Sequence, residues 1–179
     1  MTREIYLLRS FLLFCLLVST TFVSSQIVFN NGSGDSEWTN AANWSAHVPN
    51  GQQARAKFNV GGTINVSANV TVDQMIFPDA GAVVNTFSST GSNGSITMTG
   101  WNTSQPLQTN KIGQTITFNI PFTFDSRANA VETFKFNKAS ANLTFNEPFT
   151  VNDEFVIVAN HIEPNATQVN FNHSLTGNG

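Results

Sequence analysis

The chain repeats a nine-residue segment almost unchanged. Residues 116–124 read Ile-Thr-Phe-Asn-Ile-Pro-Phe-Thr-Phe, and residues 143–151 read Leu-Thr-Phe-Asn-Glu-Pro-Phe-Thr-Val, so that six of nine positions are identical at an offset of 27. A weaker third copy begins at Val169, at an offset of 26 from the second. A period of this size is typical of a solenoid, in which one unit cannot bury its apolar face alone. The repeat therefore predicts rungs that stack with equivalent residues one above another.

Within each copy, apolar and polar residues alternate as they do in a strand with one buried face. In the second copy Glu147 takes the place of the apolar Ile120. A buried unpaired carboxylate is costly, and a proline cannot donate a hydrogen bond to a sheet. We therefore expect a corner near Glu147-Pro148, so that each rung holds two short strands.

The rest of the chain reads as short strands separated by turn sequences. Candidate strands are Thr63–Val66, Asn69–Phe77, Ser95–Met98, Thr133–Phe136, Glu154–Val158 and Gln168–Phe171. No segment shows a helical period. Short strands at this spacing also suit a β-sandwich, but a sandwich gives no reason for the near-identity of the two copies. The sequence favours an all-β parallel solenoid of four to five rungs over residues 61–179.

Residues 1–25 have the pattern of a secretory signal peptide. Arg3 and Arg9 precede an apolar run, and Val23 and Ser25 stand at the spacing that a signal peptidase reads, which predicts cleavage before Gln26. The apolar run is too short for a comfortable membrane span, although a retained anchor is the alternative. We expect a secreted or cell-surface protein. The single cysteine lies in this leader, so the mature chain has no thiolate for a disulfide or a metal.

Composition narrows the choice of partners. The chain has 16 Phe, 20 Thr and 23 Asn, residues that suit a pleated surface and its turns. After cleavage six Lys or Arg face ten Asp or Glu, a net charge of −4. Nucleic-acid binding requires basic patches, so we expect no nucleic-acid partner. We also expect no membrane contact by the mature segment and no cofactor.

The segment at residues 26–60 differs in character from the rest. It contains Trp38-Thr39-Asn40-Ala41-Ala42-Asn43-Trp44-Ser45, then Val48-Pro49-Asn50-Gly51, and then Ala54, Ala56 and Phe58. This string resembles the start of secreted bacterial proteins that carry autotransporter-associated β-strand repeats. The resemblance is close for the entry motif, whereas residues 60–179 share only the general character of these proteins.

The resemblance implies a right-handed parallel β-helix. It implies an extracellular passenger, stalk or adhesin-like role without a defined ligand. An N-terminal aromatic cap is expected on separate grounds, because an open solenoid end exposes unpaired strand edges. The chain departs from the family because the Gly-rich Leu-Thr-Lys-Thr-Gly repeat is absent. The final residues 174–179 resemble the residues that precede such a repeat. We therefore expect the N-terminal part of a longer polypeptide, since nothing in the sequence after the third copy resembles a solenoid cap.

Candidate binding residues are few. Trp38 and Trp44 suit a shelf on which sugars stack, or alternatively a cap that covers the first rung. Clustered carboxylates would suit a polysaccharide lyase or hydrolase, or else they are solvated turn residues; they are Asp125, Glu132, Asp153, Glu154 and Glu163. The oxygen-rich stretch at residues 30–35, followed by Glu37, suits either Ca²⁺ or a plain turn. The histidines show no ligand spacing for a metal; they are His47, His161 and His173.

Nine Asn-x-Ser/Thr sequons exceed the roughly five that chance would produce from the definition of this acceptor motif. They indicate either glycosylation or the alternation of small polar residues on a solenoid face; the asparagines are Asn31, Asn43, Asn65, Asn69, Asn93, Asn102, Asn142, Asn165 and Asn172. The function that fits the whole is a non-enzymatic extracellular β-helix whose partners are glycans or a host or neighbour surface. A polysaccharide-active or carbohydrate-binding β-helix is the alternative.

Overall fold

The computed structural model describes residues 25–79, 84–89, 91, 94–100, 105–125, 132–136, 141–152, 155–159 and 168–177. These residues form strands β1 to β16 and one turn of 3-10 helix, η1, at Ala41–Asn43. The expectation of an all-β fold is confirmed. The signal-peptide prediction for residues 1–25 lies almost wholly outside the described residues.

The strands form three parallel sheets. Sheet A contains β1 (Ile27–Phe29), β2 (Arg55–Phe58), β5 (Gln74–Phe77), β8 (Leu107–Thr109), β11 (Glu132–Phe136) and β14 (Phe155–Ala159). Sheet B contains β3 (Gly62–Asn65), β6 (Val84–Ser88), β9 (Thr115–Asn119), β12 (Asn142–Phe145) and β15 (Gln168–Phe171). Sheet C contains β4 (Asn69–Val72), β7 (Ser95–Met98), β10 (Phe122–Phe124), β13 (Phe149–Val151) and β16 (Leu175–Gly177).

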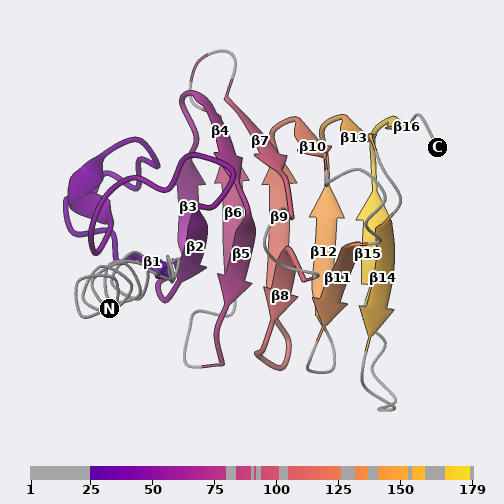
Figure 1. Cartoon of the computed structure of the whole chain (residues 1–179), viewed down its shortest axis with the longest axis horizontal. Coiled ribbons are helices and arrows are strands. Elements are labelled where there is room, and N and C mark those ends of the chain that lie inside the picture. Colours follow the sequence, from indigo (N-terminus) through magenta and orange to yellow (C-terminus); the bar gives the residue numbers. More distant parts are fainter. Residues whose placement is uncertain are drawn as a thin grey trace, which may run out of the picture.

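The chain visits sheets A, B and C in turn, so that one rung is one strand of each sheet. Five such sets, from β2-β3-β4 to β14-β15-β16, stack along the long axis of the molecule (Figure 1). The predicted parallel solenoid of four to five rungs is confirmed. Each rung has three strands rather than two, because the chain also turns between sheets C and A. The predicted strand Asn69–Phe77 is accordingly two strands, β4 and β5, separated by the corner residue Asp73.

The nine-residue copies lie on consecutive rungs, as the repeat predicts. Phe145 of β12 pairs in register with Phe118 of β9, and Phe149 of β13 pairs with Phe122 of β10. The third copy continues the register, since Phe171 pairs with Phe145. Glu147 is exposed at the corner between β12 and β13, so the predicted corner near Glu147-Pro148 is confirmed.

Columns of aromatic rings fill the core. Phe87, Phe118, Phe145 and Phe171 stack face to face, with ring centroids 4.9, 5.1 and 5.3 Å apart and interplanar angles of at most 15°. A second column joins Phe122 to Phe149 at 5.5 Å. Because the strands pair in register, an inward residue lies on the residue at the same position of the next rung, and in these two columns that residue is again Phe. The alternation of buried and outward residues thus becomes stacked rings inside and polar columns outside.

The stack begins within the segment at residues 26–60. Strand β2 of that segment pairs with β5 of sheet A, and β1 pairs with β2 on the other side. Four strands were not among the predicted ones: β1, β2, β6 and β8. Strand β16 lies in the third copy of the repeat. Strands of three to five residues occur throughout this chain, among the predicted ones as well, so length alone does not explain why these four were missed.

The buried position of Phe145 yields the first prediction. Its side chain is 1% exposed and stacks between Phe118 and Phe171. Replacing Phe145 with Ala should lower the free energy of unfolding by about 3–5 kcal/mol, because it leaves a cavity in a narrow core. Thr144→Ala, on the outward side of the same strand, should change it by less than about 0.5 kcal/mol. Denaturant melts measure both, and equal effects would contradict the assigned facing of β12.

Candidate functional site

The outer surface of sheet C carries an unbroken column of threonines. Thr97 pairs with Thr71 below and Thr123 above, and the column continues through Thr150 to Thr176. Neighbouring parallel strands lie about 4.8 Å apart, so this column repeats one hydroxyl and one methyl group at every rung. The hydroxyl oxygens of Thr150 and Thr176 are 3.2 Å apart.

Sheet B presents a wider outer surface with three columns. The central column pairs Thr86 with Thr63 and Thr117, and continues to Thr144 and Asn170. The columns on either side consist of small polar residues apart from Val84; they are Val84, Thr115, Asn142 and Gln168 on one side, and Asn65, Ser88, Asn119, Asn146 and Asn172 on the other.

Asparagines mark the corner between sheets B and C. The Asn146 amide donates to the Asn119 carbonyl oxygen and the Asn172 amide donates to that of Asn146, each at 2.7 Å. Their backbone N–H groups also donate to the preceding rung, Asn146 to the Phe118 carbonyl at 2.9 Å and Asn172 to the Phe145 carbonyl at 2.8 Å. This asparagine ladder joins the corners of the last three rungs.

The outward threonines, asparagines and neighbouring small polar residues of sheets B and C are called here the polar face. No strand of sheet B or C, as the structure describes them, contains an ionisable residue. Sheet A differs, because β2 contains Arg55 and Lys57 and β11 contains Glu132 and Lys135. The strands of the polar face can therefore exchange neutral hydrogen bonds with a partner over several rungs, while Glu147 is exposed beside them at the corner between β12 and β13.

Trp38 and Trp44 are buried, at 0% and 4% exposed. Their rings lie 5.0 Å apart and both contact Phe58. The Trp38 indole N–H donates to the Pro49 carbonyl at 3.1 Å, and that of Trp44 donates to the Trp38 carbonyl at 2.7 Å. Neither ring has an accessible face for a sugar. Burial favours the alternative interpretation, in which both rings pack at the end of the core.

The oxygen-rich stretch at residues 30–37 is organised around Asp35. Its carboxylate accepts hydrogen bonds from the Glu37 backbone N–H at 2.9 Å and from the side-chain amides of Asn43 and Asn40, each at 2.6 Å. The Ser33 hydroxyl donates to it at 2.8 Å. These bonds, the Glu37 N–H first and then Asn43, Asn40 and Ser33, hold the pKa of Asp35 well below its ordinary value.

Asn43 links this cluster to the aromatic core. It is fully buried, and its amide nitrogen donates to Asp35 and, at 2.8 Å, to the Glu37 carbonyl. Its backbone carbonyl accepts from the Asn30 N–H at 2.9 Å. The lone pairs of Asp35 that would bind Ca²⁺ already receive protein donors, so the geometry favours the plain turn. Among the described residues, no group of three or more His, Cys, Asp or Glu is placed to hold a metal ion.

The described part of the structure does not bring the candidate catalytic carboxylates together. Asp125 is exposed and accepts a hydrogen bond from the Asn152 amide at 3.2 Å. Glu132 lies in β11, where its side chain is not described, and Asp153, Glu154 and Glu163 lie outside the described residues. His173 accepts a hydrogen bond from the Ser174 N–H, and His161 also lies outside.

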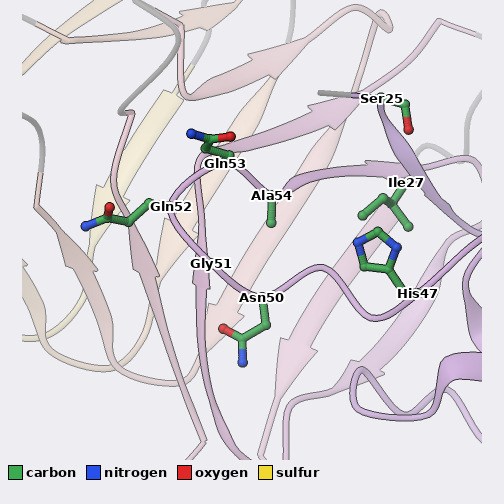
Figure 2. A pocket seen from close by; sticks show the side chains of 8 residues that line it. All are labelled: Ser25, Ile27, His47, Asn50, Gly51, Gln52, Gln53 and Ala54. Atoms are coloured by element: carbon green, nitrogen blue, oxygen red, sulfur yellow. The ribbon is translucent and has the colours of Figure 1, made fainter. Parts of the chain in front are cut away.

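His47 lines a hollow of about 420 Å³ beside the first strands of sheet A (Figure 2). The other lining residues are mostly small or carry amides; they are Ser25, Ile27, Asn50, Gly51, Gln52, Gln53 and Ala54. Of the residues described around this hollow, His47 is the one titratable side chain. The hollow thus lacks the paired acid and base that proton-transfer chemistry on a polysaccharide needs.

The described sequon asparagines fall into two groups. Asn65, Asn142 and Asn172 stand in the outward columns of sheet B, and Asn69 is exposed on β4. Asn43 is buried with its amide engaged, and Asn31 uses its side chain to bond Ser36. Alternation on the solenoid surface therefore accounts for part of the excess, while Asn93, Asn102 and Asn165 lie outside the described residues.

Comparisons with protein-family models, with curated proteins and with solved structures return no match. No helix in the described part of the chain is long and apolar enough to cross a membrane. The polar face was not among the candidate sites. The sequence did contain a sign of it, because the outward polar residues of the first copy recur in the second; Thr117, Asn119 and Thr123 become Thr144, Asn146 and Thr150. The columns themselves can be recognised only once the register of all five rungs is known.

The Asp35 cluster yields the second prediction. Because the pKa of Asp35 is lowered in the folded state, its ionised form contributes stability that is present above the pKa of the unfolded carboxyl, about 4, and is lost as the pH falls below it. We expect Asp35→Asn to lower the melting temperature of the N-terminal segment at about pH 7, with a deficit that shrinks toward about pH 3. Tryptophan fluorescence melts follow Trp38 and Trp44 in a Trp101→Phe background, because that change removes the third tryptophan. A deficit that is constant with pH would show that the charge of Asp35 is not responsible.

Proposed function

We propose that the chain is a non-enzymatic extracellular β-solenoid segment that acts as a rigid surface spacer with an adhesive outer face. The polar face carries this proposal. Its columns of Thr, Asn and Ser span all five rungs of sheets B and C and contain no ionisable residue within the described strands. A surface that repeats the same groups at each rung suits a partner that is itself extended and repetitive.

Rigidity supports the role of a spacer. Each rung joins the next through three parallel sheets, through stacked rings such as Phe118 on Phe145, and through the asparagine ladder at the corner. Repeat proteins of this type gain stability from each interface between neighbours. Bending such a stack would stretch backbone hydrogen bonds on one side, so the rungs hold a surface at a fixed distance and orientation.

The leader pattern and the entry motif support the extracellular assignment. We propose that residues 26–60 close the first rung, since Trp38 and Trp44 pack there with their indole N–H groups satisfied. The resemblance of this motif to proteins with autotransporter-associated repeats is consistent with a passenger or stalk. A mature chain without cysteine depends on core packing and backbone pairing, which the stacked rungs supply.

We propose neutral extracellular glycans as the partner of the polar face. Hydroxyl and amide groups match the hydroxyls of an uncharged polysaccharide, whereas a charged surface would be better bound by ionised residues. The outward positions of sheets B and C hold polar groups rather than aromatic rings, so binding would rest on many hydrogen bonds along the stack. The affinity of a single site would be low, and repetition would raise it.

The third prediction tests the adhesive face. Thr86→Lys combined with Thr117→Lys places two ammonium groups in the central column of sheet B. We expect binding to a neutral glycan array to fall about tenfold or more, because the charges must be desolvated against an uncharged partner. The matched control is Gln108→Lys combined with Val158→Lys, at outward positions of sheet A, and it should leave binding unchanged. Equal losses in both variants, or no glycan binding by the unaltered chain, would contradict the proposal.

The fourth prediction concerns catalysis. We expect no hydrolase or lyase activity of the purified chain on pectin, alginate or β-glucans, because general acid–base cleavage needs two groups with separated pKa values. Reducing-sugar and unsaturated-product assays measure it. Turnover that Asp153→Asn or Glu154→Gln abolishes would overturn the non-enzymatic assignment while leaving the adhesive face to be judged by its own variants.

A further inference from the structure

The outer surface of sheet C repeats a single residue type along the stack. Its strands β4, β7, β10, β13 and β16 follow one another in register (Figure 1). One outward column holds threonine at every rung; its members are Thr71, Thr97, Thr123, Thr150 and Thr176. The central column of sheet B is less uniform, because Asn170 follows its threonines. Sheet C therefore presents an uninterrupted line of identical hydroxyl and methyl groups.

A second column runs beside the threonines, two residues earlier along the chain. It consists of small or compact residues; in the first four rungs they are Asn69, Ser95, Pro121 and Pro148. The prolines keep the level of the ladder, since the Ile96 N–H donates to the Pro121 carbonyl at 3.1 Å and the Phe122 N–H donates to the Pro148 carbonyl at 3.0 Å. No long side chain rises from either column, so the two together form a low and even surface.

The two columns define a grid with two repeats. Neighbouring parallel strands lie about 4.8 Å apart, and alternate residues along one strand lie about 6.6 Å apart. Both repeats are close to the spacings of oxygen atoms on a prism face of hexagonal ice. The threonine column keeps the shorter repeat from β4 to β16 without a gap. A crystal face can therefore meet successive threonines in the same way.

Charge and rigidity also fit a crystalline and uncharged partner. The residues of the two columns carry no ionisable group, and the exposed carboxylates Asp125 and Glu147 lie beyond them at the corners. A charge within the columns would have to be desolvated against ice. Beneath the sheet, the rings of Phe122 and Phe149 stack with centroids 5.5 Å apart. The core thus fixes the spacing of the threonines before any partner arrives.

We propose that the threonine column of sheet C binds ice. Its hydroxyl groups exchange hydrogen bonds with water molecules of the crystal face, and its methyl groups fill the spaces between those molecules. Each contact is weak, because liquid water offers the same hydrogen bonds. Binding depends on many contacts that form together, which a rigid periodic surface allows. This function goes beyond the adhesive role proposed above and stands on sheet C alone.

Thermal hysteresis and the inhibition of ice recrystallisation measure this activity with the purified chain. We expect both activities in the unaltered protein. Thr97→Lys combined with Thr123→Lys places two ammonium groups in the middle of the column and should lower both activities about tenfold or more. The matched control is Thr86→Lys combined with Thr117→Lys, the same change in the central column of sheet B. It should leave both activities unchanged.

A milder variant separates loss of ice binding from loss of the fold. Thr97→Ser combined with Thr123→Ser removes two methyl groups from half-buried outward positions, so the melting temperature should stay close to that of the unaltered chain. The ice activities should fall about threefold or more, because the methyl groups no longer fill the crystal face. Absence of thermal hysteresis, equal losses in the two lysine variants, or full activity of the serine variant would overturn the proposal. A chain that binds glycans without acting on ice would overturn this inference and leave the adhesive role standing.

Discussion

In-register stacking of inward phenylalanines is the constraint on which the rest of the structure depends. Rings such as Phe87, Phe118, Phe145 and Phe171 lie face to face only if every rung returns to the same angular position. That requirement fixes strand register, and register in turn places equivalent threonines and asparagines above one another on the outside. The polar face is therefore a consequence of core packing as much as of surface composition.

Polar groups at the corners are satisfied locally, which lets the chain turn without exposing the core. The asparagine ladder serves the corner between sheets B and C. Between sheets C and A, Asp73 is fully buried, its backbone N–H donates to the Ala54 carbonyl at 2.8 Å, and its carboxylate lies 3.7 Å from Arg55. In the entry segment, Asp35 accepts from the Glu37 N–H and from the Asn43 amide, and the Asn43 amide also donates to the Glu37 carbonyl. The first two devices tie a corner to the neighbouring rung, whereas the third holds the entry segment together.

The sequence predicted the features that depend on near-identity. The pairing of Phe118 with Phe145 and the corner at Glu147-Pro148 followed from two copies of one pattern. Features that depend on variable spacing were missed. In sheet A, Met75 pairs with Ala56 on one side and with Leu107 on the other, and the second interval along the chain is much longer than the first. No fixed period could locate β8 or divide Asn69–Phe77, and the polar face emerged only when all rungs were aligned.

The variation of one corner has an evolutionary consequence. In the last three rungs, four positions separate the inward residues on either side of the corner between sheets B and C, as from Phe118 to Phe122. In the first two rungs the same corner is longer, with six positions from Ile64 to Val70 and nine from Phe87 to Ile96. The register of the sheets is kept although the corner changes length. A lineage of such chains can therefore gain or lose loops along the edges of a three-sided prism, and new recognition loops would arise there without any change to the register of the core.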